Sequence, residues 1–266
     1  MAWLLAFYAW PTIQMFFISL QEGSLERGYS LTWHWATYGE VFSKYSTQLV
    51  RSVEYGLLVT VVCLAISFPL AYFIALRGGR WKNALLFMVI LPFFVAFLIR
   101  TLSWKFILAD QGFLLGTLKQ IGLLPEDFRV LATPIAVVAG LIYNFLPFMA
   151  LPLYASLEKL DRSLLEAAQD LYSSRAVAFF RVTLPLSLPG VFAGSLLTFI
   201  PSVGDFINAQ LLGSSNTTMI GNIIQRRMLI SNDYPEGAAI SFILMAGILV
   251  GVALYARLLG TEELTG

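Results

Sequence analysis

Long apolar stretches, separated by shorter polar segments, dominate the chain. A helix needs about 20 apolar residues to cross the ~30 Å hydrocarbon core of a membrane. Stretches of that kind predict six transmembrane helices, at residues 2–20, 53–76, 84–100, 130–156, 186–208 and 237–257. The stretches are continuously apolar, which is typical of helices and not of the alternating strands of a membrane β-barrel. We therefore expect one all-α, polytopic membrane bundle that forms a single domain over residues 1–266.

The composition supports a membrane protein and excludes several other classes. Apolar residues make up 58% of the chain and charged residues 12%, against about 25% charged residues in soluble domains. The formal net charge of +1 offers no basic surface for nucleic acid. The one cysteine, Cys63, and the one histidine, His34, are too few for a disulfide framework or a metal site. We expect no metal, and we expect Cys63 to serve packing.

The charges of the loops predict the orientation in the membrane, with lipid around the bundle. Arg77, Arg80 and Lys82 fall within one short loop, and basic loops favour the cytoplasmic side. Both termini and the loops at 77–83 and 157–185 are therefore expected in the cytoplasm, and the loops at 21–52, 101–129 and 209–236 outside. The first apolar run has no cleavage motif, so it is interpreted as a span and not as a signal peptide. A basic lead-in is expected to precede it in the native protein.

Two pairs of glycines, Gly190 with Gly194 and Gly247 with Gly251, have the spacing that permits close crossing of membrane helices. We expect them to serve helix packing.

The loop at 157–185 has the pattern of a short amphipathic helix. Ser163 is followed three residues later by Glu166, as in a capping box. Apolar positions then recur at helical spacing, at Leu164, Leu165, Ala168 and Leu171. Pro185 and Pro189 are expected to bracket the return to the membrane. The small Ala167 and Ala168 beside Glu166 would let the groove of another protein approach closely, and a solvated linker with one helical turn is the alternative.

At these residues the sequence resembles the inner-membrane permease subunits of ABC importers. Their shared loop has Glu-Ala-Ala, here Glu166 to Ala168, and ends at a distance matched by Val182-Thr183-Leu184-Pro185. The six-span layout and the position of the loop between spans four and five also match. Tyr172 departs from the pattern, because the family has glycine there.

The resemblance implies a transport subunit, not an enzyme, that forms half of a translocation path in the cytoplasmic membrane of a prokaryote. It implies four partners: two ATPase subunits, a second homologous permease and an extracytoplasmic solute-binding protein. ATP and magnesium would be bound by the ATPase, because this chain has no Gly-x-x-x-x-Gly-Lys-Ser/Thr loop and needs no cofactor. The residues implied in coupling to the ATPase are Leu164, Glu166, Ala167, Ala168, Asp170, Leu171, Tyr172 and Arg175.

A narrower resemblance points to the spermidine/putrescine branch of these permeases. It is carried by Gly204-Asp205-Phe206 with Ala209–Gly213, by Met219–Gln225 and by the ending Leu259–Leu264. It implies a polyamine cargo. Importers of ferric iron, aminoethylphosphonate and other small solutes share parts of this layout and remain alternatives.

Ionisable residues inside membrane spans cost about 2.5–3.5 kcal/mol on insertion scales, so those present suggest a pathway. Asp205 near the end of span five and Glu54 at the start of span two are the candidates, with an ammonium group of the cargo drawn to Asp205. Neutral polar contacts and cation–π contacts are expected from Asn208, Gln210, Phe206, Tyr143 and Phe145. The alternative is that both acids reach water at an interface or pair with a neighbour such as Arg51.

Two other classes compete with an importer subunit. A membrane enzyme needs a nucleophile with a base or a metal cluster, which the lone His34 does not supply. A secondary transporter or channel would place paired ionisable groups or broken half-helices near the midplane, and Asp205 alone is thin support for that. The loop around Glu166 separates these classes, because only an ATP-driven importer needs an ATPase partner there.

Overall fold

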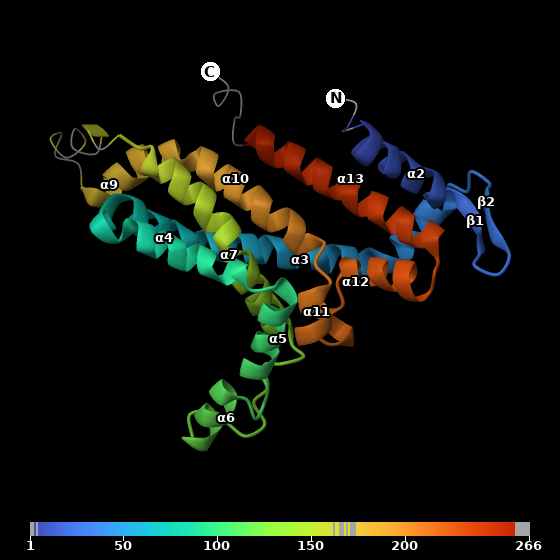
Figure 1. The fold of residues 1–266 in the computed structure, drawn as a ribbon, viewed down its shortest axis with the longest axis horizontal. Coiled ribbons are helices and arrows are strands. Elements are labelled where there is room, and N and C mark those ends of the chain that lie inside the picture. The colour runs from blue at the N-terminus through green and yellow to red at the C-terminus, as the bar shows by residue number, and fades with distance from the viewer. Residues whose placement is uncertain are drawn as a thin grey trace.

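The computed structural model describes residue 3 and residues 5–161, 163–164, 168, 170 and 174–258. Its centre is a bundle of long helices, which Figure 1 shows lying side by side along the longest axis. The members are α3 (Ala36–Tyr72), α7 (Pro134–Glu158), α10 (Leu184–Val203) and α13 (Tyr234–Leu258). α7 packs against both α3 and α10, and α2 (Trp10–Ser19) lies along α13. The expected all-α membrane bundle is confirmed.

Shorter elements connect the long helices. A π-helical turn, Leu5–Ala9, precedes α2, and an antiparallel hairpin of β1 (Gln21–Ser24) and β2 (Gly28–Leu31), which the sequence did not predict, follows it. After α3 come the turns Phe73–Arg77 and Gly79–Trp81, α4 (Lys82–Ile90), the turn Leu91–Phe94, α5 (Phe97–Ile107) and α6 (Phe113–Gln120). The second half adds α9 (Arg175–Ala178), the turn Phe179–Thr183, α11 (Ile207–Leu212), the turn Ser215–Thr217, α12 (Ile220–Gln225) and the turn Arg226–Ile230.

Within the described part of the chain, four helices are long and apolar enough to cross a membrane. They are Ala36–Arg77, Pro134–Glu158, Ala176–Val203 and Tyr234–Arg257, and they contain most of the spans expected at 53–76, 130–156, 186–208 and 237–257. A fifth candidate is a bent pair of helices, Gly79–Phe94 with Phe97–Ile107. The described residues of the first expected span, 5–19, are also helical.

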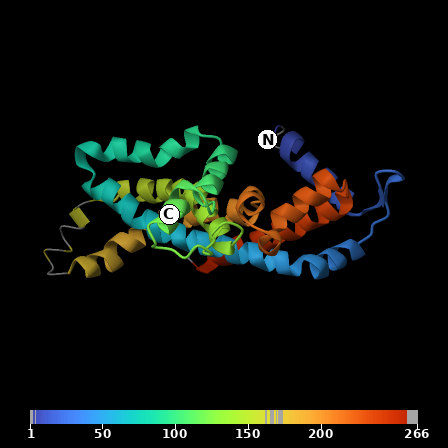
Figure 2. The same cartoon turned by 90° about the horizontal axis from the view of Figure 1, so that it is seen from below.

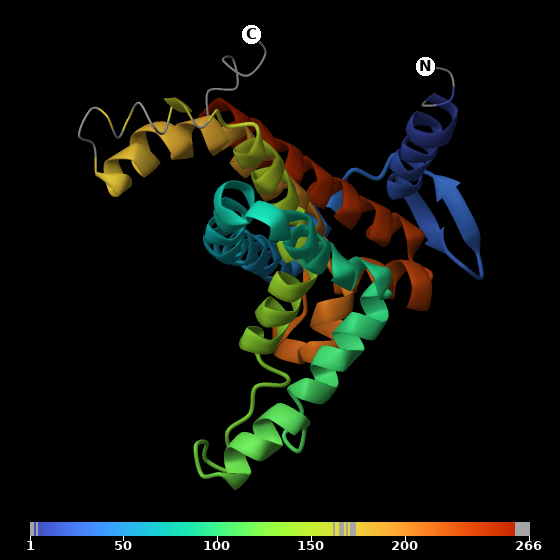
Figure 3. The same cartoon turned by 60° about the vertical axis from the view of Figure 1, so that its left-hand side comes forward.

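The structure corrects two of the expected spans. The third, expected as one helix over 84–100, bends by 93° between Phe94 and Phe97, because Pro92 starts a tight turn and Val95 and Ala96 are extended. Figure 2 shows the turn from α4 into α5, and Figure 3 shows α5 and α6 leaving the bundle after this bend. The fifth, expected over 186–208, ends at Val203, and residues 204–206 separate it from α11.

The start of the fifth span also differs from the expectation. The helix begins well before Pro185, because α9 and the π-helical turn Phe179–Thr183 run into α10 without a break. Proline has no backbone N–H, and a π-helical turn is a common way to accommodate a missing bond inside a helix. Pro185 thus lies in the first turn of α10, inside one helical rod, and does not start the span.

Close helix contacts explain two of the four glycines singled out. A Cβ on Gly190 would lie 2.6 Å from the Cβ of Ser156, and one on Gly194 would lie 2.8 Å from the sulfur of Met149. Both neighbours belong to α7, so the predicted packing role is confirmed for this pair. Gly247 and Gly251 on α13 have no described atom within 4 Å of such a Cβ. Cys63 is fully buried in the core beside α7, as expected.

Segments expected on the same side of the membrane lie together in the structure. Lys82 Nζ contacts Glu158 Oε1 at 2.6 Å, which joins the loop at 77–83 to the end of α7. At the other end, the hydroxyl of Tyr29 in the hairpin donates to the carbonyl of Asn232. Each pair of loops therefore shares one end of the bundle.

Candidate translocation site

The break between α10 and α11 holds a buried carboxylate. Asp205 is 7% exposed. Its Oδ1 accepts a hydrogen bond from the backbone N–H of Asn208 at 2.8 Å, and its Oδ2 accepts one from Asn208 Nδ2 at 3.2 Å. Asp205 therefore satisfies an N–H group at the start of α11 that has no acceptor within the helix. The start of α12 closes over the break, where a Cβ on Gly221 would collide with the carbonyl oxygen of Gly204.

Asn208 extends this contact into a buried polar network, which we define as Thr101, Asn144, Asp205 and Asn208. Asn208 Oδ1 accepts from Asn144 Nδ2 at 3.0 Å and from Thr101 Oγ1 at 3.4 Å. Asn144 Nδ2 also donates to Thr101 Oγ1 at 3.0 Å. The network joins α5, α7 and α11, and all four side chains are buried. Buried polar groups are costly unless they are hydrogen-bonded, so these contacts hold the three helices together at this point.

Close packing brings α11 onto α7 at this point. A Cβ on Gly140 would lie 2.9 Å from Asn208 Oδ1 and would collide with a methyl group of Leu212. Glycine at this position lets Leu212 and Asn208 pack directly onto α7. The side-chain carbonyl of Asn144 has no donor among the described residues.

The other five expected pathway residues lie outside the network. Phe206 is half-buried, and its carbonyl accepts from Asn222 Nδ2 at 2.8 Å. Gln210 is exposed and lines a pocket of about 290 Å³ between α11 and the turn after α12. Tyr143 packs edge-on against Trp104, with ring centroids 5.4 Å apart. Phe145 is buried against Phe97.

Glu54 is exposed on α3 and away from the network. The structure forms no ion pair between Glu54 and Arg51, the partner considered for it. Arg51 Nη1 instead donates to the carbonyl of Thr218 at 2.9 Å.

Three residues at the site were missed by the sequence analysis. Thr101 and Asn144 are neutral, although Asn144 was visible as a lone amide within the apolar run 130–156. Arg100 was placed at the very end of the third expected span, where a cation can reach water. The bend instead leaves Arg100 only 7% exposed, above the rings of Phe93 and Phe97 at 5.5 Å and 5.7 Å.

The loop at 157–185 is described in part. Asp161 Oδ1 accepts from the backbone N–H of Ser163 at 2.9 Å, and this bond holds the pKa of Asp161 below its usual range. Leu164 and Asp170 are exposed, Ala168 is half-buried, and α9 begins at Arg175. Glu166, Ala167, Leu171 and Tyr172 lie outside the described residues, so the capping box of Ser163 with Glu166 stays a prediction.

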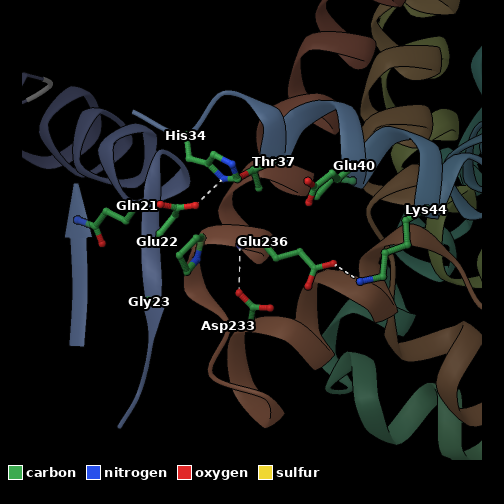
Figure 4. A pocket seen from close by; sticks show the side chains of 11 residues that line it. Gln21, Glu22, Gly23, His34, Thr37, Glu40, Lys44, Asp233 and Glu236 are labelled. Atoms are coloured by element: carbon green, nitrogen blue, oxygen red, sulfur yellow. Dashed lines mark hydrogen bonds and ion pairs between the residues drawn. The ribbon is translucent and has the colours of Figure 1, made fainter. Parts of the chain in front are cut away.

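A second polar pocket, of about 360 Å³, lies where β1, the start of α3 and the start of α13 meet (Figure 4). Its charges are largely paired within the chain. His34 Nδ1 lies 3.2 Å from Glu22 Oε1, and Lys44 Nζ lies 2.8 Å from Glu236 Oε1. Among the described residues no group of three metal-ligating side chains is found. These ion pairs therefore hold the hairpin, α3 and α13 together at this end of the bundle.

The comparisons with known proteins agree with this architecture. Residues 67–259 match the family described as "Binding-protein-dependent transport system inner membrane component". The spermidine/putrescine transport system permease protein PotB of Haemophilus influenzae is 38% identical over 259 residues, which are 96% of this chain and 90% of PotB. PotB of Escherichia coli is 40% identical over 210 residues, 79% of this chain and 76% of that protein.

A solved bacterial ABC transporter that imports the acidic polysaccharide alginate contains a chain of the same fold. The TM-score is 0.73 at 20% identity, and the match covers 97% of this chain and 91% of the other. The protein thus belongs to the family of binding-protein-dependent transport system inner membrane components, and it is a multi-pass permease subunit of an ABC importer.

Proposed function

We propose that this permease subunit imports polyamines such as spermidine and putrescine. The relatives that carry a polyamine transport name are similar over most of the chain. In the proposed assembly the chain forms half of the path with a second homologous permease, and a solute-binding protein delivers cargo from outside. Two ATPase subunits bind ATP and magnesium, and this chain carries no cofactor. The termini and the loops at 77–83 and 157–185 face the cytoplasm.

The observation that carries the cargo proposal is the buried carboxylate of Asp205 at the break between α10 and α11. An ammonium group that reaches this carboxylate gains a charge-assisted hydrogen bond in surroundings of low polarity. Asn208 already supplies two N–H donors to Asp205, and these donors keep the carboxylate oriented when no cargo is bound. Tyr143 and Phe206 offer ring faces for the methylene segments and for cation–π contacts worth about 0.5–2 kcal/mol.

The coupling proposal depends on the rod formed by α9, the turn after it and α10. Ala176–Val203 is one helical segment of 28 residues, about 42 Å long at 1.5 Å per residue. One end lies within the loop at 157–185, and the other ends at the break that holds Asp205. In the proposed mechanism an ATPase cleft holds Leu164 to Arg175, with Glu166 as the polar anchor. Closure of the two ATPases then moves the rod, and its far end shifts the site.

The test is ATP-dependent uptake by the reconstituted importer. Proteoliposomes are offered polyamines, aminoethylphosphonate, ferric iron and sugars, each with its radiolabel. We expect uptake of the polyamines, reduced at least about tenfold by Asp205→Asn because a neutral amide loses the attraction for an ammonium group. Asp127→Asn, the same substitution at an exposed loop residue, should leave uptake unchanged. Uptake of another solute in preference to polyamines would contradict the cargo proposal.

A further inference from the structure

Two buried charges of opposite sign lie at the candidate site without forming an ion pair. Arg100 and Asp205 are each 7% exposed. The Nε and Nη1 groups of Arg100 are buried and have no acceptor in the described part of the chain. Asp205 is held by the N–H groups of Asn208, and no described cationic side chain pairs with it. A buried charge without a counter-ion is strongly unfavourable, so this arrangement calls for a state in which the charges are compensated.

Arg100 lies next to the buried polar network, to which Asp205 belongs. Arg100 precedes Thr101 in α5, and Asp205 binds Asn208 at the start of α11. Thr101 and Asn208 contact each other directly, with Oγ1 and Oδ1 3.4 Å apart. Thr101, which is next to Arg100, therefore contacts Asn208, which binds Asp205.

Both charges also lie next to a break in a membrane helix. α5 follows the 93° bend at residues 95–96, and α11 follows the interruption at residues 204–206. A short helix behind a break moves as a rigid body when the few residues of the break change their backbone angles. The guanidinium is thus carried by a helix that has a hinge at its start, and the carboxylate lies within the hinge residues before α11.

We propose that Arg100 is the intramolecular counter-ion of Asp205: the two side chains pair when α5 and α11 rotate about the contact between Thr101 and Asn208, and a cargo ammonium must take the place of the guanidinium. Arg100 is then a specificity-determining residue. An arginine–carboxylate pair is often bidentate and resists a single hydrated monovalent ion, such as K⁺. A solute with several ammonium groups gains further contacts along the path and competes better. The last step rests on the proposed import of polyamines, whereas the pairing does not.

The pairing is tested by a double-mutant cycle on the purified importer complex. Arg100→Gln, Asp205→Asn and the double variant are melted in the resting state and in the state trapped with ATP, magnesium and vanadate. We expect additive changes in Tm in the resting state, to which we assign the unpaired arrangement. In the trapped state the Tm of the double variant should fall by less than the summed Tm losses of the two single variants, with a difference of at least about 2 °C.

Arg100→Gln combined with Asp127→Asn is the matched control, and it should be additive in both states. Additive behaviour of Arg100→Gln with Asp205→Asn in both states would overturn the pairing, and so would equal coupling in both. Because no solute is present, this outcome is independent of which cargo the importer carries.

The role in specificity is tested by competition in proteoliposomes. Without Arg100 the Asp205 carboxylate has no competing cation in the described part of the chain, so K⁺ should inhibit putrescine uptake at a concentration about tenfold lower than in the wild type. Arg100→Lys keeps the charge and should retain the resistance to K⁺ in large part. Unchanged K⁺ inhibition in Arg100→Gln would overturn the role in specificity.

Discussion

At the scale of single residues, neutral side chains organise the site as much as charged ones. Thr101, Asn144 and Asn208 connect three helices through hydrogen bonds of 3.0–3.4 Å. Sequence reasoning identified Asp205 and Asn208, because a carboxylate in an apolar run is conspicuous. It missed Arg100, because the burial of that residue depends on the bend between Phe94 and Phe97, which the hydropathy of the sequence does not specify.

The central position of Asn144 in the network can be tested by Asn144→Ala. The change removes the hydrogen bonds from Asn144 Nδ2 to Thr101 and Asn208 and leaves Asn208 Oδ1 with the 3.4 Å bond from Thr101. Each lost hydrogen bond costs about 0.5–1.5 kcal/mol. We expect a lower Tm of the purified complex and weaker uptake. Asn216→Ala, at an exposed position in the turn Ser215–Thr217, is the control and should change neither. An unaltered Tm in Asn144→Ala would mean that the network does not stabilise the helix contact.

The close approach of α11 to α7 predicts a large effect of one methyl group. Gly140→Ala would place a Cβ against Leu212 and 2.9 Å from Asn208 Oδ1, and overpacking of this kind costs about 1–3 kcal/mol. Gly39→Ala lies on an exposed face of α3 with nothing within 4 Å of its Cβ, and it should be neutral or slightly stabilising. Thermal melting of both variants measures the difference. Equal Tm values would argue against the tight contact.

At the scale of elements, apolar run length predicted where the helices are but not where they bend. The spans expected over 53–76 and 237–257 lie inside single helices, and so does the span expected over 130–156 except for residues 130–133. These runs are apolar over most of their length, and the prolines in the runs over 53–76 and 130–156 are accommodated within the helix. The run over 84–100 looks the same in composition. Its bend follows from Pro92 and from the extended Val95 and Ala96, a choice between two backbone conformations that hydropathy does not distinguish.

Because α9 and α10 form one uninterrupted rod, we predict that the coupling of ATP hydrolysis to uptake depends on the stiffness of this rod. Insertion of two glycines between Ala178 and Phe179 would interrupt the rod where it leaves the loop, because glycine favours the flexible backbone. We expect the complex to assemble and hydrolyse ATP, with uptake per ATP reduced at least about tenfold. The same insertion after Asp127 is the control. Normal uptake with the interrupted rod would contradict transmission through it.

At the scale of the whole molecule, the proposed importer depends on contacts outside this chain. Glu166→Lys reverses the charge of the proposed anchor for the ATPase. We expect the variant to insert in the membrane at normal levels but to lose ATPase copurification and ATP-driven uptake. Glu126→Lys, at an exposed position in another loop, controls for the added charge. ATP-driven uptake at the wild-type rate by Glu166→Lys vesicles would exclude the proposed anchor.

The buried polar network also has a mechanical consequence for the whole molecule. It ties α5, α7 and α11 at one point, deep between segments that are otherwise held by apolar contacts. Apolar surfaces can slide past one another in small steps, whereas hydrogen bonds of fixed direction permit rotation about their position more readily than translation. The network therefore acts as a fulcrum. Displacement of the end of α10 next to the loop at 157–185 would tilt the helices about this point, and the largest movement would arise far from Asp205, at the tips of α6 and of the hairpin.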